Sequence, residues 1–166
     1  MINDPQFWEF NVRTRFFQYD ARFVFENKKP MDSVYFYVRE DRDFNKYPKF
    51  ATNIVKEIYN AWTITYIMMQ IAVCMGIKVI YLLGIDNSYS IEVDNKGKIR
   101  NNSVSDSFVA GGNVQEMSGH LPNVQRMNMG YVSAYKFAKK HNIKIYNATR
   151  GGQLETFQRV SFDDLF

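Results

Sequence analysis

The sequence predicts an α/β domain with a mostly parallel sheet flanked by helices, and three observations support this class. The 166 residues are 46% hydrophobic and 16% aromatic, which suits one well-filled core and excludes a disordered or low-complexity chain. A nearly all-apolar run at 62–75 leads through Gly76 into a second apolar run at 78–83, as a buried helix leads into a buried strand. Helical and strand patterns then alternate towards the C-terminus, as they do in parallel α/β sheets.

The first half of the chain is expected to hold a helix, two strands and a loop. Asp4 suits the N-cap of a short helix that runs to about Phe17. Residues 21–26 alternate like a strand, and the denser apolar run at 34–38 predicts another. The charged stretch at 40–50 predicts a loop.

The second half is expected to alternate helices and strands. A helix at 62–75 is closed by Gly76 at the position after the C-cap. The strand at 78–83 is apolar enough for the centre of a parallel sheet. The remaining elements follow in order: a polar loop at 87–121, an amphipathic helix at 122–141, a strand at 143–146, a loop at 147–152 and a short helix from 163.

Composition narrows the classes of function. The net charge of +4 permits an anionic ligand, but no basic stripe with interleaved aromatics predicts a nucleic-acid partner. One cysteine, Cys74, and two histidines predict neither a disulfide framework nor a metal site. No apolar run approaches the roughly 20 residues of a membrane span, and the N-terminus lacks a signal-peptide pattern. We therefore expect a cytoplasmic protein without a membrane span.

The end of the strand at 78–83 is a candidate site, because ligands of open α/β sheets bind beyond the carboxyl ends of the strands. Gly84 allows a sharp turn there, from which Asp86 would project to bind a sugar hydroxyl or a metal. Capping of the local turn explains Asp86 equally well. The hydroxyl of Tyr89 is a candidate hydrogen-bond donor to a phosphate, although packing is the commoner role of a tyrosine.

The end of the strand at 143–146 is a second candidate. A loop with backbone N–H groups, a hydroxyl and a guanidinium can surround an anion. The alternative interpretation is a glycine-rich turn with a solvated arginine. The residues concerned are Asn147, Thr149, Arg150, Gly151 and Gly152.

Two further candidates lie elsewhere. Free N–H groups at the start of the helix at 62–75 favour an anion beside Thr63 and Thr65, although capping by Asn60 or Thr63 explains these residues equally well. His120 lies in the long polar loop and is a candidate general base.

Two segments resemble the MptE-like family of Rossmann-type proteins. Residues 63–86, T-I-T-Y-I-M-M-Q-I-A-V-C-M-G-I-K-V-I-Y-L-L-G-I-D, look like the helix–strand–G-[IV]-D unit of that family. Residues 145–166, I-Y-N-A-T-R-G-G-Q-L-E-T-F-Q-R-V-S-F-D-D-L-F, look like its closing segment. Family members usually begin with a strand and a G-x-G-P-S-L turn, whereas the first 75 residues here contain no glycine. The resemblance implies one Rossmann-like domain over residues 1–166 that lacks the N-terminal glycine-rich βα unit and is N-terminally incomplete.

The resemblance also implies a function. The family includes archaeal 6-hydroxymethyl-7,8-dihydropterin diphosphokinases, motility accessory factors implicated in flagellin glycosylation, and members from surface-glycan gene clusters. It is similar in fold to bacterial sialyltransferases that use CMP-sialic acid, in which the G-I-D turn and a following tyrosine face the nucleotide phosphate. That points to Asp86 and Tyr89 here. The general base of those enzymes is a histidine in the following loop, and His120 lies several residues beyond the matching place.

The leading expectation is a nucleotide-dependent transferase domain that binds a nucleotide or nucleotide-activated sugar, with Asp86 and His120 as catalytic residues. One alternative is ATP-dependent pyrophosphoryl transfer with Mg²⁺, for which Asp94 and Asp106 are further acids in the long loop. Another alternative is a non-catalytic remnant or interaction module. An open sheet edge would also favour a homo-oligomer.

Overall fold

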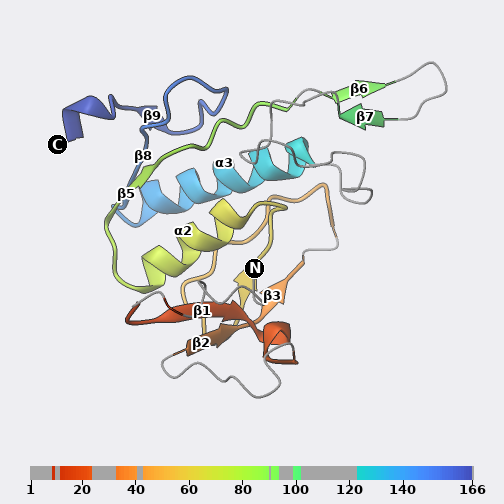
Figure 1. Cartoon of the computed structure of the whole chain (residues 1–166), viewed down its shortest axis with the longest axis vertical. Helices are drawn as coiled ribbons and strands as arrows, with labels where there is room; N and C mark the ends of the chain where they lie inside the picture. The colour runs from red at the N-terminus through yellow and green to blue at the C-terminus, as the bar shows by residue number, and fades with distance from the viewer. Residues whose placement is uncertain are drawn as a thin grey trace.

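The computed structural model describes residue 9 and residues 12–23, 33–40, 43–89, 91–93, 99–101 and 123–165. In this part of the chain, helices accompany short strands that form four small sheets, three of them parallel. Figure 1 shows the helices α2 (Ile64–Cys74) and α3 (Val124–Lys140) side by side between the N-terminal strands and the C-terminal strands. The α/β class predicted from the sequence is confirmed at this level.

Strands form most of the described N-terminal part, although residue 9 is helical, as the sequence predicts. β1 (Arg15–Gln18) lies parallel to β2 (Ser33–Phe36), and the 3-10 helix η1 (Tyr19–Phe23) follows β1. The helix expected up to Phe17 is therefore wrong over residues 12–17, and the strand expected at 21–26 is wrong over residues 21–23. Pairing with β2 and packing of Phe16 against a buried cluster override the local helical pattern. Residues 4–8, 10, 11 and 24–26 lie outside the described residues.

Two very short strands come next. β3 (Val38–Arg39) pairs in parallel with β4 (Ile58–Tyr59). The apolar run at 34–38 is thus confirmed as extended, although Tyr37 interrupts it between β2 and β3. The described residues of 40–50 form no helix or strand, as expected.

Helix α2 (Ile64–Cys74) lies between two buried clusters, which explains why its sequence is nearly all apolar. Tyr66 and Met69 belong to the main cluster with α3 and β5, whereas Ile67 belongs to a second cluster with the N-terminal strands. The helix begins at an N-cap, Thr63, and Gly76 follows its C-cap with a φ of +86°. Both ends confirm the sequence prediction.

A three-stranded parallel sheet carries the C-terminal half. Its order is β5 (Val79–Leu82), β8 (Lys144–Asn147) and β9 (Gln158–Arg159). β5 was expected at the centre, but among the described residues it is an outer strand and β8 lies in the middle. β9 has only two residues, too few to show an alternating pattern in the sequence.

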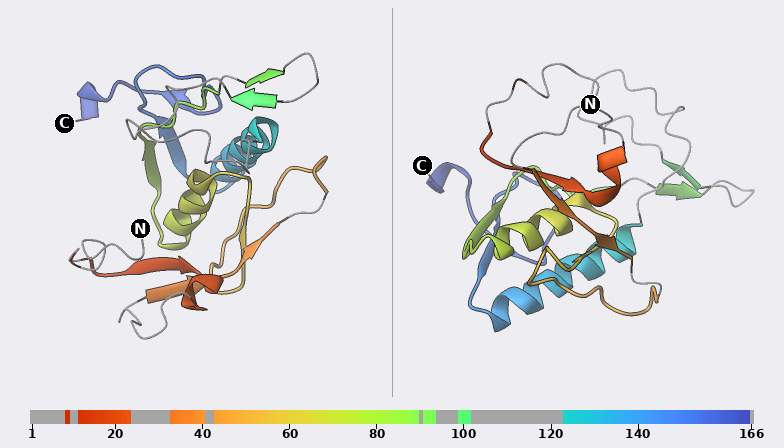
Figure 2. Two further views of the ribbon diagram at one scale, coloured as in Figure 1. Left: turned by 45° about the vertical axis from the view of Figure 1, so that its right-hand side comes forward. Right: turned by 90° about the horizontal axis from the view of Figure 1, so that it is seen from below.

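Helix α3 (Val124–Lys140) covers one face of this sheet. Its N-cap is Asn123, and its buried face includes Met127, Tyr131 and Ala134. α2 and α3 lie side by side, and both begin at the end of the molecule towards which β5 and β8 point (Figures 1 and 2). This arrangement confirms the helix expected at 122–141 and the strand expected at 143–146.

The remaining elements are small. β6 (Ile91–Val93) and β7 (Ile99–Asn101) form an antiparallel pair inside the segment expected to be a loop, and the rest of residues 90–122 lies outside the described residues. A 3-10 helix, η2 (Asp163–Leu165), forms where a short final helix was expected. Among the described residues, neither α-helix has the length and apolar character that crossing a membrane requires.

Candidate functional site

The turns that follow β5 and β8 meet at the carboxyl edge of the sheet. The backbone N–H of Gln153 donates to the carbonyl of Asp86 at 2.6 Å. The N–H of Ile85 donates to the hydroxyl of Thr149 at 3.0 Å. The two candidate segments that the sequence singled out at strand ends are therefore in direct contact, as the parallel topology predicts.

Glycines make this contact possible. Gly84 turns the chain after β5 with a φ of +67°. Gly152 has a φ of +75°, and a Cβ atom there would lie 2.6 Å from the carbonyl oxygen of Asp86. Only glycine fits both the left-handed backbone and the close approach. Gly151 has a similar φ of +73° but faces open space.

Asn147 and Thr149 hold the loop together from inside. Asn147 is 1% exposed, donates to the carbonyl of Leu154 at 2.8 Å and accepts from the N–H of Thr149 at 3.0 Å. The hydroxyl of Thr149 also donates to the carbonyl of Leu82 at 3.4 Å. Both side chains therefore act first as structural anchors of the loop.

Arg159, in β9, also holds the loop in place, and nothing in the sequence identified it. Its guanidinium donates to the carbonyls of Gly151 at 2.8 Å, Gly152 at 3.0 Å and Thr149 at 3.3 Å. It also pairs with Glu155 at 2.6 Å, and this bond lowers the pKa of Glu155 and raises the pKa of Arg159. One arginine nine residues after Arg150 gives no signal in the sequence, because its role depends on β9 pairing with β8.

Arg150 and Asp86 are the exposed charges of the site. Arg150 contacts Asp163 at 2.5 Å, with side chains 73% and 71% exposed, and its guanidinium lies over the ring of Phe162. Such an exposed ion pair contributes little to the stability of the fold, so Arg150 can exchange Asp163 for a ligand. In the described part of the chain, no group pairs with the carboxylate of Asp86 or accepts from the N–H groups of residues 150–152.

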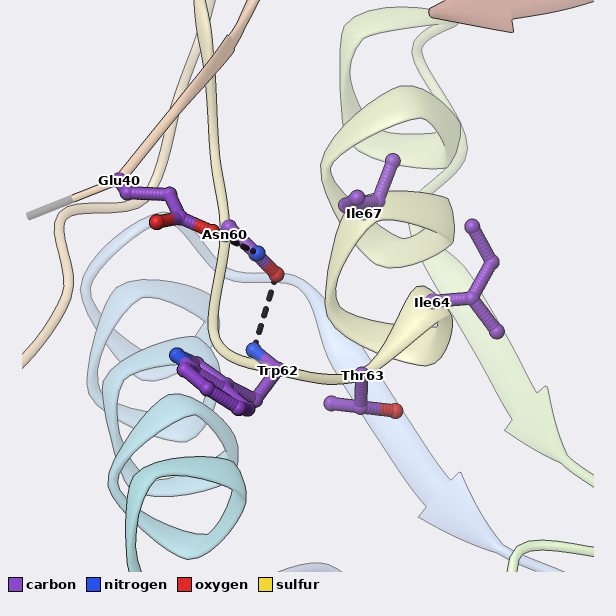
Figure 3. A pocket seen from close by; sticks show the side chains of 6 residues that line it. All are labelled: Glu40, Asn60, Trp62, Thr63, Ile64 and Ile67. Carbon is purple, nitrogen blue, oxygen red and sulfur yellow. Dashed lines mark hydrogen bonds between the residues drawn. The ribbon is translucent and has the colours of Figure 1, made fainter. Parts of the chain in front are cut away.

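A hollow of about 430 Å³ opens at the start of α2 (Figure 3). The hydroxyl of Thr63 caps the helix by accepting from the N–H of Thr65 at 3.3 Å, and Thr65 itself is buried. Asn60 accepts from the N–H of Trp62 at 2.9 Å, so Thr63 rather than Asn60 is the N-cap. The hollow is lined by Glu40, Asn60, Trp62, Thr63, Ile64 and Ile67.

The other predicted site residues are not assembled here. Tyr89 is half-buried and packs against the main core. This is the packing role that was the alternative to a phosphate contact. His120 lies outside the described residues, as do Asp94 and Asp106. Among the residues that are described, no three His, Cys, Asp or Glu side chains gather as a metal site would need.

Comparison of the chain with protein-family models, curated proteins and solved structures gives no match.

Proposed function

We propose that the chain is a nucleotide-dependent transferase domain that uses a nucleotide-activated sugar in surface-glycan or flagellin glycosylation. The observation that carries this proposal is the contact between the Asp86 turn and the loop at 147–152. It brings the carboxylate of Asp86, which has no partner among the described residues, the displaceable guanidinium of Arg150 and three backbone N–H groups to one edge of a parallel sheet.

These groups suit the two chemical parts of a nucleotide sugar. The carboxylate of Asp86 is an acceptor for ribose or sugar hydroxyls. Arg150 and the N–H groups of residues 150–152 are donors for phosphate oxygens. Because Arg159 fixes the carbonyls of the loop, little loop entropy remains to be lost on binding.

The surrounding architecture supports a Rossmann-like arrangement. β5, β8 and β9 are parallel, and α2 and α3 both begin at the edge where these strands end (Figures 1 and 2). Helix N-termini carry partial positive charge and so favour an anionic ligand at this edge.

A non-catalytic interaction module is the second candidate. It is favoured by the internal use of Asn147 and Thr149, whose polar groups already bond within the loop. The third reading, ATP-dependent pyrophosphoryl transfer with Mg²⁺, needs several acids beside Asp86. Asp94 and Asp106, which this hypothesis requires, lie outside the described residues. Pyrophosphoryl transfer therefore stays a prediction from the resemblance.

Removal of the Arg150 guanidinium tests the proposed phosphate contact. Arg150→Ala is expected to weaken binding of CMP or a nucleotide sugar by about 1.5–3 kcal/mol, the usual loss for a charge-assisted hydrogen bond. Isothermal titration measures this difference directly. Arg39→Ala is the matched control, because Arg39 is likewise exposed and paired with a carboxylate, Glu57, but lies in β3. Equal affinities of the two variants would remove Arg150 from the site.

A further inference from the structure

Lysines gather at the edge of the sheet opposite the candidate site. Figure 1 shows that α2 and α3 end on the same side of the molecule, where β5 begins. The turns on this side carry exposed lysines and two exposed apolar side chains, which together are called the basic edge below. Its members are Lys78, Lys139, Lys140 and Lys144, with Met75 and Ile77.

The backbone holds these residues together. The N–H of Lys144 donates to the carbonyl of Lys78 at 2.8 Å, at the start of the β5–β8 pair. Lys139 and Lys140 form the last turn of α3, and the N–H of Ile143 returns to the carbonyl of Ala138 at 2.9 Å. The four lysines therefore project from two adjoining turns.

No acid balances these charges locally. The segments at 74–79 and 137–145 contain neither aspartate nor glutamate. Within the described part of the chain, no carboxylate pairs with any of the four lysines. The basic edge is thus a concentrated positive patch on a chain whose net charge is only +4.

The apolar part of the basic edge is the tip of a turn. Met75 is 60% exposed and Ile77 is 41% exposed. Between them, Gly76 has no heavy atom within 4 Å of the place a Cβ would occupy, so the glycine itself faces open space. Met75 and Ile77 lie at the end of an apolar groove that Phe16 and Met68 also line. Large aliphatic side chains at an exposed tip, with lysines around them, form an amphipathic surface.

We propose that the basic edge docks on an anionic lipid bilayer. The lysines would contact headgroup phosphates while Met75 and Ile77 enter the boundary of the acyl chains. A single-stranded nucleic acid fits less well, because it would call for exposed aromatic stacking platforms. The rings of Phe137 and His141 on this side already stack on each other, with centroids 4.1 Å apart, and Phe137 also stacks on Phe50 at 4.4 Å. Docking in this way leaves the carboxyl edge of the sheet facing away from the bilayer.

Co-sedimentation with vesicles tests the electrostatic part. The chain is expected to bind vesicles that contain phosphatidylglycerol, to ignore pure phosphatidylcholine vesicles, and to dissociate as salt is raised. Replacing all four lysines of the basic edge by glutamine should weaken binding by about 600-fold, from about a fivefold loss for each lysine. The matched control changes Lys46, Lys49, Lys56 and Lys136 to glutamine, an equal loss of charge elsewhere on the surface.

Two more variants test the apolar part. Met75→Ser with Ile77→Ser should weaken vesicle binding several-fold, whereas Val55→Ser, at a residue 79% exposed, should not. Circular dichroism confirms that each variant is folded. The proposal fails if the wild-type chain ignores anionic vesicles, if it binds neutral vesicles as strongly, or if both lysine sets weaken binding equally. It also fails if the lysine variant of the basic edge loses affinity for polyuridylate but keeps its affinity for vesicles.

Discussion

Two neighbouring glycines share a backbone conformation but not an environment. Gly151 and Gly152 both lie in the left-handed region, and only Gly152 faces the backbone of Asp86. Gly151→Ala should cost about 1–2 kcal/mol for the left-handed backbone alone. Gly152→Ala should cost about 1–3 kcal/mol more, because the Cβ forces the two turns apart.

Urea unfolding of the two alanine variants measures this difference. Gly151→Ala is the control for backbone strain at almost the same φ. Equal free energies of unfolding would mean that the contact between Asp86 and the loop does not hold the two turns together.

At the residue scale, the sequence identified side chains better than it identified their roles. Gly84, Asp86 and Thr149 do meet at one edge, because strand ends of a parallel sheet lie together. The inward bonds of Thr149 could not be foreseen, since they depend on Leu82, 67 residues away. The clamp made by Arg159 is hidden for the same reason.

At the scale of elements, Gln70 fastens α2 to the segment before it. Its side chain is fully buried, accepts from the N–H groups of Ala51 at 3.0 Å and Tyr59 at 3.1 Å, and donates to the carbonyl of Tyr59 at 2.8 Å. Gln70→Leu should destabilise the fold by roughly 3 kcal/mol or more, because it leaves several buried backbone groups without partners. Met68→Leu, at an exposed position of the same helix, should change stability by less than about 0.5 kcal/mol. Thermal unfolding compares the two variants, and similar midpoints would contradict the anchoring role.

The Glu155–Arg159 pair stabilises the loop in a pH-dependent way. The folded state lowers the pKa of Glu155 below its ordinary value of 4.5 through the hydrogen bond from Arg159. The stabilisation is therefore complete above that value and is lost as the pH falls through the lower, folded-state pKa. Glu155→Gln should lower the free energy of unfolding near pH ~7, and the difference in this free energy from wild type should shrink near pH ~3. Asp164→Asn, at an exposed acid of η2, is the control in this titration. If the difference in free energy of unfolding stayed constant across this pH range, the Glu155–Arg159 pair would not be the source of the stabilisation.

Long elements with strong patterns were predictable, and short ones were not. The helices α2 and α3 and the strands β5 and β8 lie within a residue or two of their expected bounds, because capping residues and apolar periodicity mark them. β4 and β9, with two residues each, depend wholly on their sheet partners. β1 was expected to be helical, since nothing in its own sequence indicates pairing with β2.

At the scale of the whole molecule, α2 lies between two hydrophobic clusters. Its sequence is a single apolar run that does not distinguish them. One side of the helix packs with α3 and the β5–β8–β9 sheet, and the other packs with Phe36 and Ile58. The sheet gives the molecule two distinct edges. Its carboxyl edge holds the candidate site, and its amino edge holds the proposed lipid-docking surface, so the two proposals can fail independently.

The most direct test of the nucleotide site is a thermal-shift series with CMP, CMP-sialic acid, UDP-sugars and ATP with Mg²⁺. A ligand at about 100 times its Kd should raise the unfolding midpoint by roughly 5–10 °C. We expect this shift with a nucleotide sugar, its loss in Asp86→Asn and Arg150→Ala, and its persistence in Arg39→Ala. No shift with any of these ligands at millimolar concentration, or a shift that both site variants retain, would contradict a nucleotide site at the carboxyl edge of the sheet.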